Sequence, residues 1–155
     1  MEQGLSTLVP RPGEGSKVFA EGGVTVTEGT EAIELSPDPL DNFMVGQGHC
    51  VGDLVFLSGQ AAIDQNGAIV GEGDIDAQIN QAMDNISRAL KTVGSGIDRI
   101  FKITIFLTDM SHFDRVMAMR ERYFQKPWPA DTTVGVAALA LPALMIELEV
   151  IATRA

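Results

Sequence analysis

The residues best suited to chemistry in this sequence are two glutamates near its C-terminal end, Glu147 and Glu149. They alternate with Ile146, Leu148 and Val150, which is the period-two pattern of a strand with one buried face. A strand this apolar is predicted to lie inside a sheet, so the two carboxylates share its other face. There they are either solvated or held in a cleft, and a cleft that removes water would raise a carboxyl pKa towards a range useful for proton transfer.

The other reactive side chains are few. His49 and Cys50 precede an apolar run, but adjacent residues on a strand point to opposite faces, which argues against a joint Cys–His nucleophile. His112 stands alone at the predicted start of a helix. Two isolated histidines and one cysteine do not have the spacing of a zinc site, so the sequence predicts no metal site.

Composition narrows the class of protein. The chain has 155 residues, enough for one domain with a real core, and its 21 acidic residues outnumber 11 basic ones for a net charge of −10. Phosphate binding needs cationic surface, so this balance argues against nucleic acid as a partner. No apolar run approaches the roughly 20 residues that span a bilayer. With no secretory signal pattern and a single cysteine, the sequence predicts a cytoplasmic protein.

Several elements must position the two glutamates. Apolar residues at three- and four-residue spacing predict a helix over 75–93, with Asp74 or Asp76 capping its start. A strand is expected over 98–108, and a second helix with Ser111 as its N-cap. The remaining strands are expected over 51–60, 129–136 and 146–152. With strands, helix, strand, helix and strands in this order, both helices can pack on one face of a single mixed sheet.

Residues 1–41 differ from the rest of the chain. They hold eight acidic residues against two basic ones, and glycine and proline interrupt them throughout. Short strands are possible at 24–27 and 32–35. We interpret this segment as an acidic, partly flexible N-terminal extension with too few apolar residues to form its own core. The folded domain is then expected over 42–155.

Two blocks of sequence carry a family resemblance. The tracts PADTTVGV at 129–136, Leu141-Pro142 and IELEVIA at 146–152 resemble the signature of the RidA/YjgF family, the reactive enamine and imine deaminases. In that family the pattern runs P-A-R-[ST]-x-V-x-V-x-x-L-P and then [IV]-E-[IL]-E-x-[IV]-A. The run VGDLVFLSGQ at 51–60 resembles a second block of the same family, G-[DN]-[LM]-[ILV]-[FY]-[ILVT]-S-G-Q. One position departs from the pattern, because Asp131 stands where the active deaminases carry arginine.

This resemblance implies a fold and an assembly. Family members have a chorismate-mutase-like α+β fold, a mixed sheet with two helices on one face, and form trimers whose sheets line a central barrel. Their ligand sites lie in clefts between subunits, and their reaction needs neither metal nor organic cofactor. The expected partners of this chain are therefore two further copies of itself and a small molecule, with no nucleic acid and no membrane.

The resemblance also assigns the site. In the deaminases a glutamate orients the water that attacks the imine carbon, and this role falls on Glu147. We place Asp131 in the same catalytic centre, although it would repel a substrate carboxylate that arginine attracts; a turn or capping role is the alternative. Either the substrate has no carboxylate at that point, or it is cationic, or another residue supplies the cation. The expected substrate-binding residues are Phe43, Ser58, Gln60, Thr132, Thr133 and Glu149.

Two functions follow from these residues. The first is a RidA-like hydrolase or deaminase acting on an enamine, imine or related nitrogen compound without arginine-based recognition of a 2-carboxylate. The alternative is a trimer of the same fold that binds a small molecule for regulation and does no catalysis. Glu147 favours the first, and Asp131 favours the second over an ordinary imine deaminase. Some members of the family are described as endoribonucleases, a function that the acidic balance of this chain disfavours.

Overall fold

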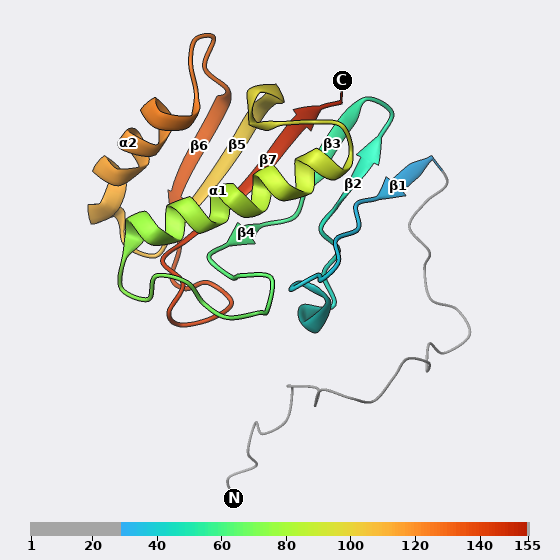
Figure 1. Ribbon diagram of the computed structural model, residues 1–155. Coiled ribbons are helices and arrows are strands. Elements are labelled where there is room, and N and C mark those ends of the chain that lie inside the picture. The colour runs from blue at the N-terminus through green and yellow to red at the C-terminus, as the bar shows by residue number, and fades with distance from the viewer. Residues whose placement is uncertain (1–28, 155) are drawn as a thin grey trace, which may run out of the picture.

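One mixed sheet with both helices on the same face makes up the fold (Figure 1). The computed structural model describes residues 29–154. Within them, seven strands form a sheet in the order β1-β2-β3-β7-β5-β6, with β4 paired to β7. Among these strands the β5–β6 pair is parallel and the other pairs are antiparallel. The strands are β1 Thr30–Ala32, β2 Gly48–Val51, β3 Leu54–Leu57, β4 Gln60–Ala61, β5 Ile100–Leu107, β6 Ala130–Gly135 and β7 Ile146–Thr153.

The helices begin at carboxylate caps. Helix α1 spans Ile75–Thr92, and the Asp74 side chain accepts the backbone N–H groups of Asp76 and Ala77, as the sequence predicts. Helix α2 spans Phe113–Tyr123. The prediction of Ser111 as its N-cap is wrong, because a 3-10 turn, η3 Met110–His112, precedes α2, and Asp109 accepts the Ser111 N–H at the start of that turn. Two further 3-10 turns are η1 Asp41–Phe43 and η2 Ile97–Arg99. Neither described helix is long and apolar enough to cross a membrane.

The core lies between the helices and the sheet. Met83, Ile86 and Leu90 of α1 pack against the buried face of β5 and β7, and α2 adds Val116 and Met119 to the same cluster. The predicted α+β architecture, a mixed sheet with two helices on one face, is therefore confirmed (Figure 1).

The opposite sheet face, which we call the open face, has no helix over it in the described residues. Leu54 and Phe56 of β3 alternate with buried residues and are each 39% exposed, and Val134 of β6 is 37% exposed. Apolar side chains gathered on one exposed face are typical of an interaction surface.

One strand escapes the sequence analysis. The sequence predicts no strand over 42–50, but β2 occupies Gly48–Val51 and forms a hairpin with β3. The turn of this hairpin interrupts the strand expected over 51–60. A side chain at Gly48 would put its Cβ 2.1 Å from the Phe56 carbonyl oxygen, so glycine is required there. Gly48 is thus a site of close strand approach.

The sheet also begins earlier in the chain than residue 42. Strand β1 pairs with β2, and Ile33, which follows β1, is 3% exposed in the core. The strand expected over 32–35 is therefore shifted to Thr30–Ala32, while the one expected over 24–27 lies outside the described residues. We propose that the folded domain starts near Thr30 and that the acidic extension precedes it.

Candidate functional site

Glu147 borders a small, mostly apolar cavity at the end of β7. Register pairs Glu147 with Ala61 of β4, and the neighbouring strand residues Gly59 and Gln60 form part of the wall. The cavity has a volume of about 180 Å³. It is lined by Pro39, Leu40, Phe43, Val45, Gly59, Gln60, Ala61, Ile63, Asn85, Ala140, Leu144 and Glu147. The structure thus brings together three of the residues that the sequence predicts for the site: Glu147, Phe43 and Gln60.

The Glu147 carboxylate is held without a partner. Within residues 29–154 it makes no hydrogen bond and no ion pair. Burial raises the pKa of Glu147, and the neighbouring charge of Glu149 raises it further. Both causes disfavour the charged form, so this carboxyl is better able to take up and release a proton near neutrality than an ordinary glutamate.

Gly59 makes the space in which this carboxylate lies. A Cβ at position 59 would be 2.1 Å from Oε1 of Glu147 and 2.7 Å from its Cδ. Any larger residue would therefore displace the carboxylate from the wall of the cavity. The Ser-Gly-Gln turn between β3 and β4 thus has a direct physical relation to the glutamate on β7.

Gln60 anchors the loop that closes one side of the cavity. Its Nε2 donates to Oε1 of Gln47 at 3.1 Å, and Nε2 of Gln47 donates to Oδ1 of Asp38 at 2.7 Å. Asp38 also accepts the Leu40 N–H at 2.8 Å. Gln60 and Gln47 are 3% and 1% exposed, so this buried polar chain fixes the segment that carries Phe43 into the cavity wall.

Ser58 has a structural contact. Its hydroxyl donates to the carbonyl oxygen of Gly46 at 2.6 Å, which ties the same loop to the end of β3. Ser58 does not line the cavity. A role for Ser58 in binding substrate therefore stays a prediction.

Asp131 lies on the other side of the sheet. Register pairs it with Ile103, whose side chain is in the core under the helices. Arg120 of α2 makes a two-pronged ion pair with the Asp131 carboxylate, and it also donates to the Thr133 hydroxyl at 2.8 Å. The side chains of Arg120 and Asp131 are only 23% and 19% exposed. Within one chain, Asp131 and Thr133 are not part of the cavity beside Glu147.

Thr132 and Glu149 occupy a third place, on the open face. Glu149 pairs in register with Thr104, and Thr104 pairs with Thr132 on its other side. Lys102 crosses this face and donates to the Thr104 hydroxyl at 3.1 Å. The predicted site residues therefore divide among the Glu147 cavity, the α2–β6 edge and the open face.

Two residues near these places are missed by the sequence analysis. Asn85 of α1 lines the Glu147 cavity and donates to the carbonyl oxygens of Ala61 and Ile63 at 3.0 and 2.8 Å. Arg120 supplies the cation beside Asp131. In both cases the available signal is a polar residue on the apolar face of a predicted helix.

His49 and Cys50 of β2 lie outside these places. Cys50 pairs with Val55 and is 1% exposed in the core, while His49 pairs with Phe56 of the open face. The two side chains therefore point to opposite faces, as predicted. In residues 29–154, no three His, Cys, Asp or Glu side chains are grouped so that they could hold a metal ion.

The fold and the Glu147 cavity together define the class. The mixed sheet is mainly antiparallel and carries two helices on one face, and a strand glutamate lies beside a Ser-Gly-Gln turn. These features define a chorismate-mutase-like α+β protein. The sequence model of the family described as Endoribonuclease L-PSP matches residues 34–154. The chain therefore belongs to this family, which is the RidA/YjgF family.

Individual relatives support this assignment. The chain is 43% identical over 107 residues to AldR of Lactococcus lactis, a protein named as a candidate regulator, covering 68% of this chain and 83% of AldR. It is 39% identical over 104 residues to HMF1 of Saccharomyces cerevisiae, covering 67% and 79%. The crystal structure of YyfA, a Rid family protein of Yersinia pestis, aligns with a TM-score of 0.73 at 32% identity, covering 80% of this chain and 98% of YyfA.

Proposed function

We propose that this protein hydrolyses a small imine or enamine to a carbonyl compound and ammonia, with Glu147 as the residue that handles the proton. The observation that carries the proposal is the unpaired Glu147 carboxylate in a mostly apolar cavity, with its pKa raised by burial. A carboxylate in that setting is poorly solvated and has no structural partner among the described residues. Membership of the RidA/YjgF family supports this chemistry.

The proposed reaction is a balanced hydrolysis. Glu147 accepts a proton from water while the water oxygen forms a bond to the carbon of the protonated imine, which gives a hemiaminal. Its protonated carboxyl then gives the proton to the nitrogen. As the carbon–nitrogen bond breaks and ammonia leaves, Glu147 takes the proton of the hydroxyl, whose oxygen becomes the carbonyl. An enamine enters the same path after protonation of its carbon converts it to the iminium form. No metal or organic cofactor takes part in these steps.

The substrate in this proposal is not held by a 2-carboxylate. Asp131 stands at the β6 position where the resemblance places arginine. Its carboxylate already accepts hydrogen bonds from two nitrogens of the Arg120 guanidinium. A carboxylate ligand would have to displace Asp131 from a largely covered ion pair. A neutral or cationic imine meets no such competition.

The proposed assembly is a homotrimer with its open faces turned inward. That face carries Leu54, Phe56 and Val134, all more than a third exposed in a single chain, and burying them would remove apolar surface from water. In such a trimer Thr132 and Glu149 of the open face can meet a neighbouring subunit's Glu147 cavity, and the edge strand β6 brings Asp131 and Thr133 to its border. This arrangement is in keeping with the inter-subunit clefts of the family. Light scattering at micromolar concentration tests this assembly, and a monomer mass would contradict it.

The single buried cysteine fits the proposed cytoplasmic location.

The test of activity uses pairs of imines with and without a 2-carboxylate. An amine oxidase or an amino-acid oxidase generates each imine in place, and semicarbazide traps what is not hydrolysed. We expect wild-type protein to accelerate loss of the carboxylate-free imine and to have little effect on the 2-imino acid. Strong activity on the 2-imino acid would show that the protein recognises the carboxylate through another cation, such as Arg120.

Two double variants sharpen this test. Asp131→Arg alone would set two guanidinium groups side by side, so we combine it with Arg120→Ala, which leaves the new arginine unpaired. This variant is expected to gain activity on 2-imino acids, about tenfold or more for a new charged hydrogen bond. The matched control, Asp131→Arg with Arg120→Asp, keeps the new arginine paired and is expected to show no gain.

Ligand binding without catalysis is the second candidate function. The ion pair between Arg120 and Asp131 favours this binding function. An ordinary deaminase of the family would present an unpaired arginine at position 131. The name of AldR agrees with a regulatory role. A folded trimer that binds imine products and leaves the hydrolysis rates of all imines tested unchanged would establish this function instead. Ribonuclease activity is not proposed, because the chain carries a net charge of −10.

A further inference from the structure

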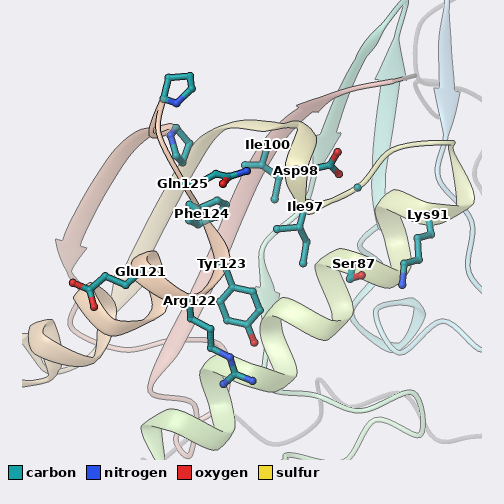
Figure 2. Close-up of a pocket in the computed structure, with 13 residues that line it drawn as sticks. Ser87, Lys91, Ile97, Asp98, Ile100, Glu121, Arg122, Tyr123, Phe124 and Gln125 are labelled. Carbon is teal, nitrogen blue, oxygen red and sulfur yellow. The ribbon is translucent and has the colours of Figure 1, made fainter.

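A second and larger cavity lies on the helix-bearing side of the molecule (Figure 2). Its volume is about 660 Å³, inside the range of roughly 300–1,000 Å³ that small-molecule sites occupy. The C-terminal half of α1, the turn η2, the start of β5 and the segment after α2 form its walls. It shares no lining residue with the cavity beside Glu147.

One wall of this cavity is fixed in place by Asn80 of α1. Oδ1 of Asn80 accepts the Tyr123 hydroxyl at 3.1 Å and Nη1 of Arg122 at 2.8 Å. The Arg122 guanidinium also lies over the Tyr123 ring, 5.2 Å from its centroid. Tyr123 is therefore held in place before any ligand arrives, which lowers the entropic cost of binding.

Apolar side chains form the middle of the cavity. Ile97, Tyr123 and Phe124 are each partly buried and line it together with Pro127 and Pro129. In Figure 2 the Phe124 and Ile97 side chains lie between the charged groups of η2 and α2. This surface can take an apolar group of moderate size.

Charged groups of both signs surround the apolar middle. Lys91, Arg122 and Asp98 line the cavity, and none of them makes an ion pair within residues 29–154. Gly96 lets the Asp98 carboxylate fold against the backbone, because a Cβ at Gly96 would be 2.5 Å from its Oδ1. A fourth charged residue, Glu121, points away from the other labelled side chains in Figure 2.

We propose that this cavity binds a zwitterionic amino acid with an apolar side chain. Lys91 matches its carboxylate, Asp98 matches its ammonium group, and Phe124 with Ile97 contacts its side chain. A simple anion is a poorer fit, because the whole chain carries a net charge of −10 and repels anions at long range. The elements that line the site include α1 and α2, which lie on the helix-bearing side of the sheet, so covering the open face leaves the site accessible.

The test is an NMR titration of the full-length chain with L-leucine and L-phenylalanine. Two analogues of leucine separate the charges: 3-methylbutylamine lacks the carboxylate, and 4-methylpentanoate lacks the ammonium group. We expect saturable shifts with the amino acids and affinities about tenfold or more weaker for each analogue, since each loses one charged hydrogen-bonding group. The absence of saturable binding up to about 10 mM, which corresponds to a binding free energy of less than roughly 3 kcal/mol, would overturn the proposal.

Variants locate the site. Lys91→Ala and Asp98→Asn are expected to weaken binding of leucine about tenfold each. Arg115→Ala, a charge removal on α2 outside this cavity, is expected to leave the affinity unchanged. Unchanged binding in the Lys91→Ala and Asp98→Asn proteins would overturn the proposal. Loss of binding in Glu147→Gln would also overturn it, because the amino acid would then occupy the cavity beside Glu147.

Discussion

Glu147 and Asp131 are two carboxylates that the sequence predicts for one catalytic centre, and the structure places them in contrasting surroundings. Glu147 is partly buried beside an apolar cavity, and no partner within residues 29–154 stabilises its charge. Asp131 is also largely covered, but the Arg120 guanidinium holds it with two hydrogen bonds and Thr133 completes the cluster. Burial alone therefore does not make a carboxylate reactive.

This contrast assigns different tasks to the two residues. A desolvated, unpaired carboxyl changes protonation readily and suits proton transfer. A paired carboxyl on an edge strand instead joins elements, and Asp131 links β6 to α2 through Arg120. The following predictions test whether the two tasks can be separated, from the largest expected effect to the smallest.

Glu147→Gln should have the largest effect. Without a group to move the proton, turnover of a carboxylate-free imine should fall by about 10²–10⁴-fold. The trimer should remain, because the substitution keeps the shape of the side chain. Steady-state rates against the uncatalysed hydrolysis measure the loss. Glu72→Gln is the matched control, because Glu72 lines neither cavity. An equal loss there would show that the cavity beside Glu147 has no special role.

Gly59→Ala should reduce activity without removing the carboxylate. The added Cβ would be 2.1 Å from Oε1 of Glu147, so the carboxylate must shift, and a shift near 1 Å can cost about 10²-fold in rate. Gly46→Ala is the control, because a Cβ there meets nothing within 4 Å. Full activity in Gly59→Ala would mean that the position of the carboxylate is not critical.

The Arg120–Asp131 pair should contribute to stability. A double-mutant cycle with Arg120→Ala and Asp131→Ala, measured by denaturant unfolding, is expected to give a coupling free energy of about 1–2 kcal/mol. The Arg115–Asp76 pair links α2 to α1 and is more open, with side chains 43% and 49% exposed, so its coupling should be smaller. Equal couplings would remove the distinction between a covered and an open pair.

The pH dependence of stability should reveal Glu147 with a small effect of defined sign. Because burial raises its pKa above the ordinary 4.5, the folded chain binds this proton more tightly than the unfolded chain. The contribution of this proton to the free energy of unfolding is complete below the pKa of the unfolded chain. It is lost as pH rises through the pKa of Glu147 in the folded chain. Unfolding free energies across this window should therefore fall more steeply in wild type than in Glu147→Gln. Parallel curves would contradict the shift.

Period-two and helical patterns predicted most of the fold. The strand at 146–152, the helix at 75–93 and the strand at 129–136 appear as β7, α1 and β6 with small shifts at their ends. β7 and α1 have clear apolar faces, and β6 lies in a tract that resembles the family signature. Strand β2 was missed because Gly46 and Gly48 resemble a loop, while pairing with β3 requires a close approach at Gly48. The N-cap at Ser111 was misplaced because Asp109 caps a 3-10 turn that no pattern indicates.

The candidate site was predicted less completely. The sequence predicts Glu147, Phe43 and Gln60 for the site, and all three line one cavity. Their role in binding or catalysis stays a prediction. The sequence could not show that Asp131 faces the helices, because that depends on the parallel register between β5 and β6. Nor could it pair Asp131 with Arg120, because the two residues meet only when α2 packs over the edge strand.

The most direct test of this account is the titration of the Glu147 carboxyl itself. Carbon-13 labelling of glutamate side chains, with Glu147→Gln to assign the signal, gives its pKa in the folded protein. The account predicts a midpoint above the ordinary value of 4.5, because burial and Glu149 both disfavour the charged form. A midpoint at or below 4.5 would show that this carboxylate is solvated or paired, and would contradict its assignment as the reactive group.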